Sequence, residues 1–129
     1  MSERLVLDSS GWIEFFTDGP NADPFAEAIE QPERLVVPTI SLFEVFKWIL
    51  REHGEGPALQ AIALMQGAEV VGLSPEIALH GAQLSLELKL PMADSLMLAT
   101  AQAFGALLIT QDSDFQGLAG VRWLPKVAG

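Results

Sequence analysis

Four short apolar runs, none alternating with polar residues, constrain the fold of this chain most. They are Leu5–Leu7, Leu35–Val37, Val70–Val71 and Ala106–Ile109, and Val121–Leu124 is a weaker fifth candidate. A strand that is apolar at every position needs cover on both faces, which is typical of a parallel sheet between layers of helices. The runs therefore predict a buried, mostly parallel central sheet.

Helical patterns separate these runs. Apolar residues recur at helical spacing from Ser41 to His53, and Gly54 is expected to end that helix. The other predicted helices are Ser10–Phe16, Asp23–Glu30 with Asp23 as N-cap, Pro57–Gln66, Pro75–Leu90 and Ala93–Phe104. Strand and helix alternate, so we predict one α/β domain over residues 1–129, with helices flanking the sheet.

Composition excludes several classes of protein. Seven basic and 17 acidic residues give a net charge of −10, which rules out a binding module that relies on a broad basic face. Cysteine is absent, so a thiol nucleophile and a Cys-ligated metal are excluded. Residues 95–111 carry no charge, but Thr100, Gln102 and Gly105 interrupt them. We expect a buried helix and strand there rather than a membrane span, in a cytoplasmic protein.

Four acidic residues stand where a predicted strand ends or a helix begins: Asp8, Glu44, Asp94 and Asp112. In a sheet of this kind such positions gather at one edge. Each acid alone has an ordinary explanation as a helix cap, a dipole partner or a turn residue, and Ser41 to Glu44 matches a capping box. Together they would repel one another unless a cation were bound. Oxygen ligands without His or Cys favour Mg²⁺, or Mn²⁺, over zinc.

Four segments carry a resemblance to a known family. Residues 7–13, 38–45, 92–101 and 108–115 contain the sequences LDSSGWI, PTISLFEV, MADSLMLATA and LITQDSDF. In order and spacing they resemble a PIN domain, especially the VapC-type ribonuclease toxins of prokaryotic toxin–antitoxin pairs, over the whole length of the chain. The resemblance implies Mg²⁺-dependent endonucleolytic cleavage of RNA, a homodimer, and an antitoxin that blocks the site.

The same resemblance assigns roles to residues. Asp8, Glu44, Asp94 and Asp112 match the acidic quartet of the family. Asp8, Asp94 and Asp112 are then expected to hold the metal, and Glu44 to orient or deprotonate the attacking water. Asp114 competes with Asp112 for the fourth role, and we choose Asp112 because it comes first after the strand.

Polar and basic residues complete the expected site. Ser10 and Thr110 match family positions that support the first and fourth acids. Lys47 and Arg51 share a helix face one turn beyond Glu44, so with Lys89 they are candidates to hold an RNA backbone, although a solvated helix face is an equal alternative.

The acidic charge also predicts a kind of partner. Residues 5–33 contain seven acids and no base, which suits a basic partner segment rather than RNA. Among the aromatic residues, Trp12 is a candidate to line the cleft. Phe43 and the other aromatics on apolar helical faces (Phe15, Phe16, Phe46 and Trp48) are expected in the core or an interface.

Two rival functions differ from RNA cleavage. A Mg²⁺-dependent phosphatase usually has a second Asp two residues after its nucleophile, and Ser10 stands there instead. A non-catalytic PIN scaffold would be favoured if one of the four acids were missing, and none is.

Overall fold

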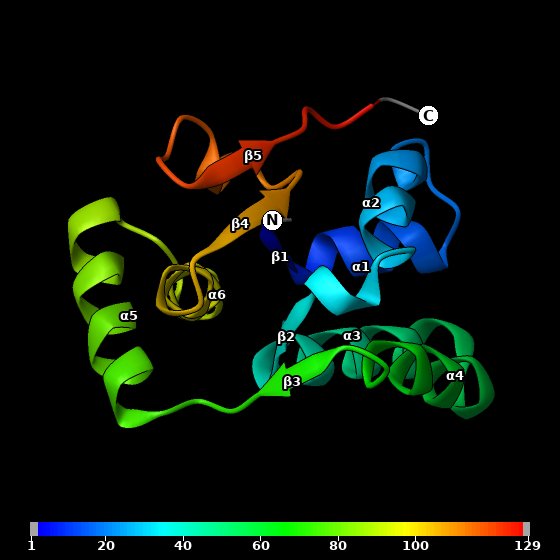
Figure 1. The fold of residues 1–129 in the computed structure, drawn as a ribbon. Coiled ribbons are helices and arrows are strands. Elements are labelled where there is room, and N and C mark those ends of the chain that lie inside the picture. Colours follow the sequence, from blue (N-terminus) through cyan, green and yellow to red (C-terminus); the bar gives the residue numbers. More distant parts are fainter. Residues whose placement is uncertain (1–2, 128–129) are drawn as a thin grey trace.

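The computed structural model describes residues 3–127, and within them five short parallel strands form the centre of the fold (Figure 1). The strands are β1 (Arg4–Leu7), β2 (Val36–Pro38), β3 (Glu69–Val71), β4 (Ala106–Thr110) and β5 (Val121–Trp123). β1, β4 and β5 pair in that order, and β2 pairs with β3. A single parallel bridge between Leu5 and Leu35 joins the two sets. The predicted α/β fold with a parallel sheet is confirmed.

Six α-helices flank these strands in the described residues. They are α1 (Ser9–Phe16), α2 (Ala22–Ile29), α3 (Thr39–His53), α4 (Glu55–Met65), α5 (Pro75–Leu88) and α6 (Met92–Ala103). Single turns of 3₁₀ helix occupy Pro32–Arg34 and Ser113–Phe115. α3 ends at Gly54 as predicted, because its φ of 92° is a conformation that only glycine adopts without strain. No helix of residues 3–127 is both long and apolar enough to cross a bilayer.

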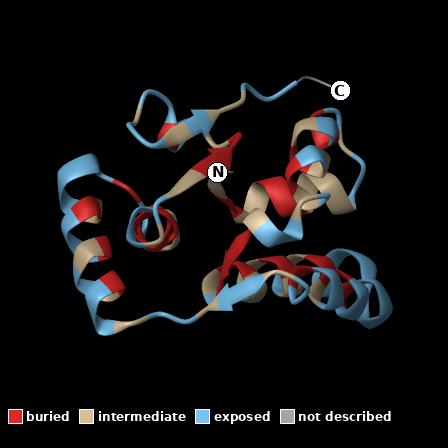
Figure 2. Cartoon of the chain, viewed as in Figure 1, coloured by how far each residue is buried: buried red, intermediate tan, exposed pale blue. Residues whose placement is uncertain are grey.

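Successive residues of each central strand point to opposite faces, and each face has its own core. Leu5 and Leu7 pack with α1 to α4 on one side, whereas Val6 and Leu108 pack with α5 and α6 on the other. The buried residues in Figure 2 follow this division, since β1, β2, the end of β4 and the inward helix faces are buried, while β3 and the outer sides of α4 and α5 are largely exposed. Both faces of β1, β2 and β4 are therefore covered, which explains their unbroken apolar runs. The burial predicted for Val70–Val71 is wrong, because β3 is largely exposed.

Five of the six helices begin one or two residues before the predicted start, and the difference changes the N-terminal caps expected for α2 and α3. α2 begins at Ala22, so Asp23 lies in its first turn instead of capping it. Asn21 precedes the helix, and its side-chain amide donates to Gln111 Oε1 at 3.1 Å and to the Pro125 carbonyl at 2.9 Å. These long-range bonds hold the start of α2 against the end of β4 and the chain beyond β5.

The capping box that residues 41–44 match in the sequence, the ordinary alternative for Glu44, is absent. α3 begins at Thr39, so Ser41 is already inside the helix and Glu44 is in its second turn. The buried Ser41 hydroxyl donates to Met97 Sδ of α6 at 3.2 Å. The helix starts early because Pro38, in β2, directly precedes it with extended backbone.

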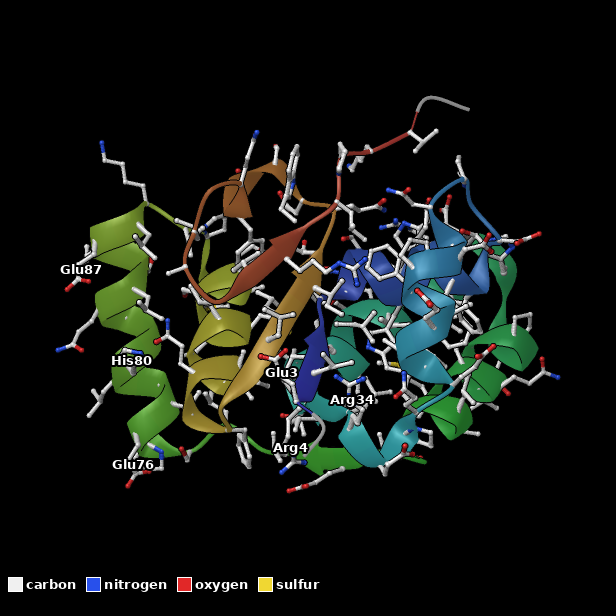
Figure 3. All side chains as sticks on the ribbon, turned by 45° about the horizontal axis from the view of Figure 1, so that its top comes forward. Glu3, Arg4, Arg34, Glu76, His80 and Glu87 are labelled. Carbon is white, nitrogen blue, oxygen red and sulfur yellow. The ribbon has the colours of Figure 1, made fainter. Side chains whose placement is uncertain are left out.

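Two arginines lie at the N-terminal edge of the sheet. Arg4 pairs with Glu69 of β3, and its guanidinium lies 5.8 Å from the centre of the Phe104 ring. The Arg34 side chain donates to the Glu3 carbonyl at 2.6 Å, and Figure 3 shows Glu3, Arg4 and Arg34 close to the start of β1. Both arginines are held by local partners at the end of β1 away from Asp8.

Candidate metal centre

All four predicted acids line one cleft at the carboxyl edge of the sheet. Asp8 follows β1 and Asp112 follows the neighbouring β4, while Asp94 comes from the first turn of α6 and Glu44 from α3. Their side chains surround a cleft of about 400 Å³. Parallel strands bring the ends of β1 and β4 together, and the two helices contribute the remaining acids from the flanks.

Asp8 is a buried carboxylate with several hydrogen-bond donors. It caps α1 by accepting from the Gly11 N–H at 3.1 Å. Ser10 Oγ donates to its two oxygens at 2.9 and 3.0 Å, and Thr110 Oγ1 donates to Oδ2 at 2.7 Å. Burial raises the pKa of Asp8 to about 6, with a further contribution from the charge of Asp112, although these hydrogen bonds oppose the rise.

Asp94 is the most strongly perturbed acid of the cleft. Burial is the largest cause, followed by repulsion from Asp112, Asp8, Asp114 and Glu44, and together they raise the pKa of Asp94 to about 7. Part of its perturbation therefore comes from the other acids of the cleft. The carboxylates are close enough that their full ionisation is unfavourable without a counter-charge.

Asp114 joins the acids that the sequence analysis selected. One carboxylate oxygen from each of Asp94, Asp112 and Asp114 lies within 4.8 Å of the other two. The Asp112 side chain also accepts from the Asp114 N–H at 2.9 Å. Asp112 is half-buried and lines the cleft, whereas Asp114 is exposed.

The supporting hydroxyl groups are arranged partly as expected. The Ser10 hydroxyl donates to Asp8, as expected. The Thr110 hydroxyl bonds two acids of the site, since it donates to the Asp8 carboxylate and accepts from the Asp112 N–H at 2.9 Å. Sequence reasoning gave no role to Ser9, whose hydroxyl donates to Glu44 Oε1 at 2.5 Å. Its position beside Asp8 at the start of α1 was the available signal.

Two of the three candidate cations lie in the cleft. Lys47 and Arg51 line it on the α3 side, beyond Glu44. Lys89 lies outside the cleft, at the C-terminal end of α5, in a left-handed conformation with a φ of 57°. The helix pattern therefore placed the first two correctly, while the nearness of Lys89 to Asp94 in the sequence was misleading.

The structure places Trp12 outside the cleft and Phe43 and Trp48 in its lining. Trp12 does not line the cleft but is 1% exposed, packed in the core against Phe16 with 5.9 Å between the ring centres. Phe43, expected in the core or an interface, is 55% exposed and lines the cleft. Its spacing of four residues from Lys47 was a signal that both share one helix face.

Comparison with known proteins identifies the family. The sequence matches the PIN domain over residues 5–121. This chain belongs to the PIN domain family. No curated protein sequence gives a significant match to this PIN domain.

Solved structures resemble this PIN domain over nearly its whole length. A toxin–antitoxin complex from Klebsiella pneumoniae aligns with a TM-score of 0.77 and 26% identity, covering 92% of this chain and 95% of that one. DNA-bound VapBC from Salmonella typhimurium aligns with a TM-score of 0.77 and 18% identity, covering 96% of this chain and 98% of that one. VapC20 of Mycobacterium tuberculosis, a toxin that cleaves the sarcin–ricin loop, aligns with a TM-score of 0.72 and 18% identity. The alignment covers 92% of this chain and 98% of that one. The structural neighbours of this PIN domain thus include VapC toxins.

The donor set of the cleft suits a hard divalent cation. Its carboxylates offer oxygen ligands, and the residues that line it include no His or Cys. Mg²⁺ and Mn²⁺ prefer such ligands, and a bound cation offsets the mutual repulsion that adds to the effect of burial on the pKa values of Asp8 and Asp94. The acidic cluster of this PIN domain is consistent with the metal sites of PIN nucleases.

Proposed function

We propose that this PIN domain is a Mg²⁺-dependent endoribonuclease and the toxin of a VapBC-type toxin–antitoxin pair. One observation carries the proposal: four carboxylates line one open cleft, and burial together with mutual repulsion raises the pKa of two of them. Such a cluster is costly unless it binds a cation, and family membership supports a nuclease use of that cation.

Each residue of the site has a role in this proposal. Asp8, Asp94 and Asp112 hold the metal, directly or through water, and Asp114 is the alternative to Asp112. A bound Mg²⁺ supplies Lewis-acid polarisation of the scissile phosphate and activation of water.

The remaining groups act on the carboxylates and the water. Ser10 and Thr110 keep the oxygens of Asp8 in place through the hydrogen bonds described above. Glu44, held by the Ser9 hydroxyl, orients the attacking water or accepts its proton.

The partners follow from the charge of the molecule. A net charge of −10 repels RNA at long range, so contact with the phosphates depends on the metal and on Lys47 and Arg51. The same acidity attracts a basic polypeptide, whose Arg or Lys side chains compete with the metal for the carboxylates. We therefore propose a cognate antitoxin with a basic segment at the cleft. The resemblance to VapC toxins, rather than the charge, supports the proposal of a homodimeric toxin. The similar Klebsiella structure, which is a toxin–antitoxin complex, supports the antitoxin assignment.

Cleavage of single-stranded RNA with and without Mg²⁺ tests the proposed activity. Asp8→Asn and Asp94→Asn should abolish Mg²⁺-dependent cleavage while circular dichroism stays unchanged, because Asn keeps the volume of Asp and removes its charge. Glu87→Gln is the matched control, since Glu87 is an exposed acid of α5 (Figure 3) and does not line the cleft.

Three outcomes would contradict the proposal. Cleavage that survives Asp94→Asn would exclude the acidic cleft as the active site. RNA or protein binding without any cleavage would favour a non-catalytic scaffold. Hydrolysis of small phosphorylated compounds but not of RNA would favour a phosphatase.

A further inference from the structure

Phe43 is an exposed aromatic residue inside a charged cleft. Its side chain is 55% exposed, whereas Phe25 and Phe115 are completely buried in the two cores. It directly precedes Glu44 on α3, and both residues line the cleft. A ring left in water contributes little to folding, and this ring lies beside the acids, where a molecule that enters the cleft would contact it.

A cation beside Phe43 defines which surface of the ring is available. Lys47 Nζ lies over the ring, 5.6 Å from its centre, which is the geometry of a cation–π contact. One ammonium group covers one face of the ring and favours a defined orientation of it. A base that stacks on this ring would therefore contact the opposite face.

The cleft side of α3 presents this ring and two cations in a row. Phe43, Lys47 and Arg51 follow one another at intervals of four residues, so they form a stripe about 12 Å long on one face of the helix. All three line the same cleft as the acids. An aromatic platform beside cations is the arrangement by which proteins bind single-stranded nucleic acid, with bases on the rings and phosphates on the cations.

We propose that Phe43 stacks on an unpaired nucleobase next to the cleaved phosphate, while Lys47 and Arg51 hold the adjoining backbone. This inference rests on the proposed ribonuclease function and names the side chains that would position its single-stranded substrate. A base inside a duplex is already stacked on its neighbours and cannot present its face to the ring. Arg4 and Arg34 do not offer a competing backbone track, because both are held at the opposite edge of the sheet.

Stacking can be measured without cleavage. Short single-stranded RNAs carrying 2-aminopurine at successive positions are titrated with the Asp94→Asn protein in the presence of Mg²⁺, and quenching reports a stacked base. We expect strong quenching at one position. Phe43→Leu, which keeps apolar bulk but lacks a π face, should remove that quenching and weaken binding about 5- to 150-fold, the range contributed by one stacked base.

Two further variants separate stacking from general effects. Phe43→Trp retains an aromatic face and should preserve the quenching. Leu59→Ala is the matched control, because Leu59 is 53% exposed on α4 and lies outside the cleft. It should bind like the parent protein.

Cleavage by the otherwise unaltered protein supplies a second measurement. An abasic ribose at the quenched position should lower kcat/KM of wild type by the same factor as Phe43→Leu, and combining the two changes should cause no further loss. Quenching that survives Phe43→Leu, or losses that multiply, would overturn the proposal. So would a Phe43→Leu variant that binds RNA normally and fails only to capture a basic polypeptide.

The two proposals fail in different ways. If wild type cleaves no RNA but the position-specific quenching depends on Phe43, the ribonuclease assignment is wrong and the proposal that Phe43 stacks on a base is correct. If cleavage depends on Asp94 but neither cleavage nor quenching responds to Phe43→Leu, the ribonuclease assignment is correct and the proposal that Phe43 stacks on a base is wrong.

Discussion

Removing one carboxylate from the acidic cleft should stabilise the metal-free protein. The substitution is Asp94→Asn, which keeps the shape of the side chain. Burial and four neighbouring acids raise the pKa of Asp94 from the ordinary 3.8 to about 7. Above that pH the ionised side chain opposes folding, and the neutral amide does not.

The size of the effect follows from the pKa. A rise from 3.8 to about 7 corresponds to ~4 kcal/mol for a fully buried group, at about 1.4 kcal/mol per tenfold change in proton affinity. Asp94 is only half-buried, so solvent screening reduces the expected gain to roughly 1–2 kcal/mol. For a chain of this size that gain raises Tm by about 3–8 °C.

The pH dependence has a definite sign. Folded Asp94 binds its proton more tightly than unfolded Asp94, so the stability of wild type falls as pH rises from about 4 to about 7. The Asp94→Asn variant lacks this loss. The advantage of the variant should therefore be complete above about pH 7 and vanish towards pH 4.

Calorimetric unfolding in EDTA at about pH 8 and about pH 4.5 measures the Tm difference between wild type and Asp94→Asn at each pH. Millimolar Mg²⁺ at the higher pH should reverse the order, because a cation that binds only the native state stabilises wild type more than the variant. A lower Tm of Asp94→Asn in EDTA at the higher pH would refute the electrostatic reasoning, as would an equal gain at both pH values. Equal responses of the two proteins to Mg²⁺ would contradict the metal site.

Three more predictions concern the same cleft. Asp112→Asn should reduce cleavage more than Asp114→Asn, because Asp114 is exposed; the reverse order in kcat/KM would exchange their roles. Thr110→Val should lower the free energy of unfolding by about 1–3 kcal/mol in urea titrations, because it removes a donor to buried Asp8 and an acceptor for the Asp112 N–H; an unchanged value would contradict this account. Calorimetric titration with a basic antitoxin peptide should show affinity that falls with salt and with Asp94→Asn; affinity insensitive to both would place that partner elsewhere.

The fold was largely predictable because its signals are local. A run such as Leu5–Leu7 is apolar at every position, and a buried parallel strand requires that pattern whatever covers it. Helix ends were predictable where one residue decides the backbone, as at Gly54. Helix starts were not predictable where a distant group binds the side chain: the Ser41 hydroxyl, which matches a capping box in the sequence, donates instead to Met97 of α6.

The composition of the acidic site was also visible in the sequence. Asp8 and Asp112 each stand just past the end of a strand, and parallel strands carry such residues to one edge of a sheet. The sequence by itself therefore determined that carboxylates would converge. Their supports depend on contacts between residues far apart, since Thr110 is 102 positions from Asp8 and Ser9 is 35 from Glu44.

Only the tertiary structure decided which aromatic residues the cleft exposes. Trp12 and Phe43 both lie on apolar helical faces close to an acid, and helical spacing does not distinguish them. α1 packs across the sheet with Trp12 inward against Phe16, whereas Phe43 projects from α3 into the cleft beside Lys47. The exposure of a side chain is set by the elements that pack over it, and those elements come from distant parts of the chain.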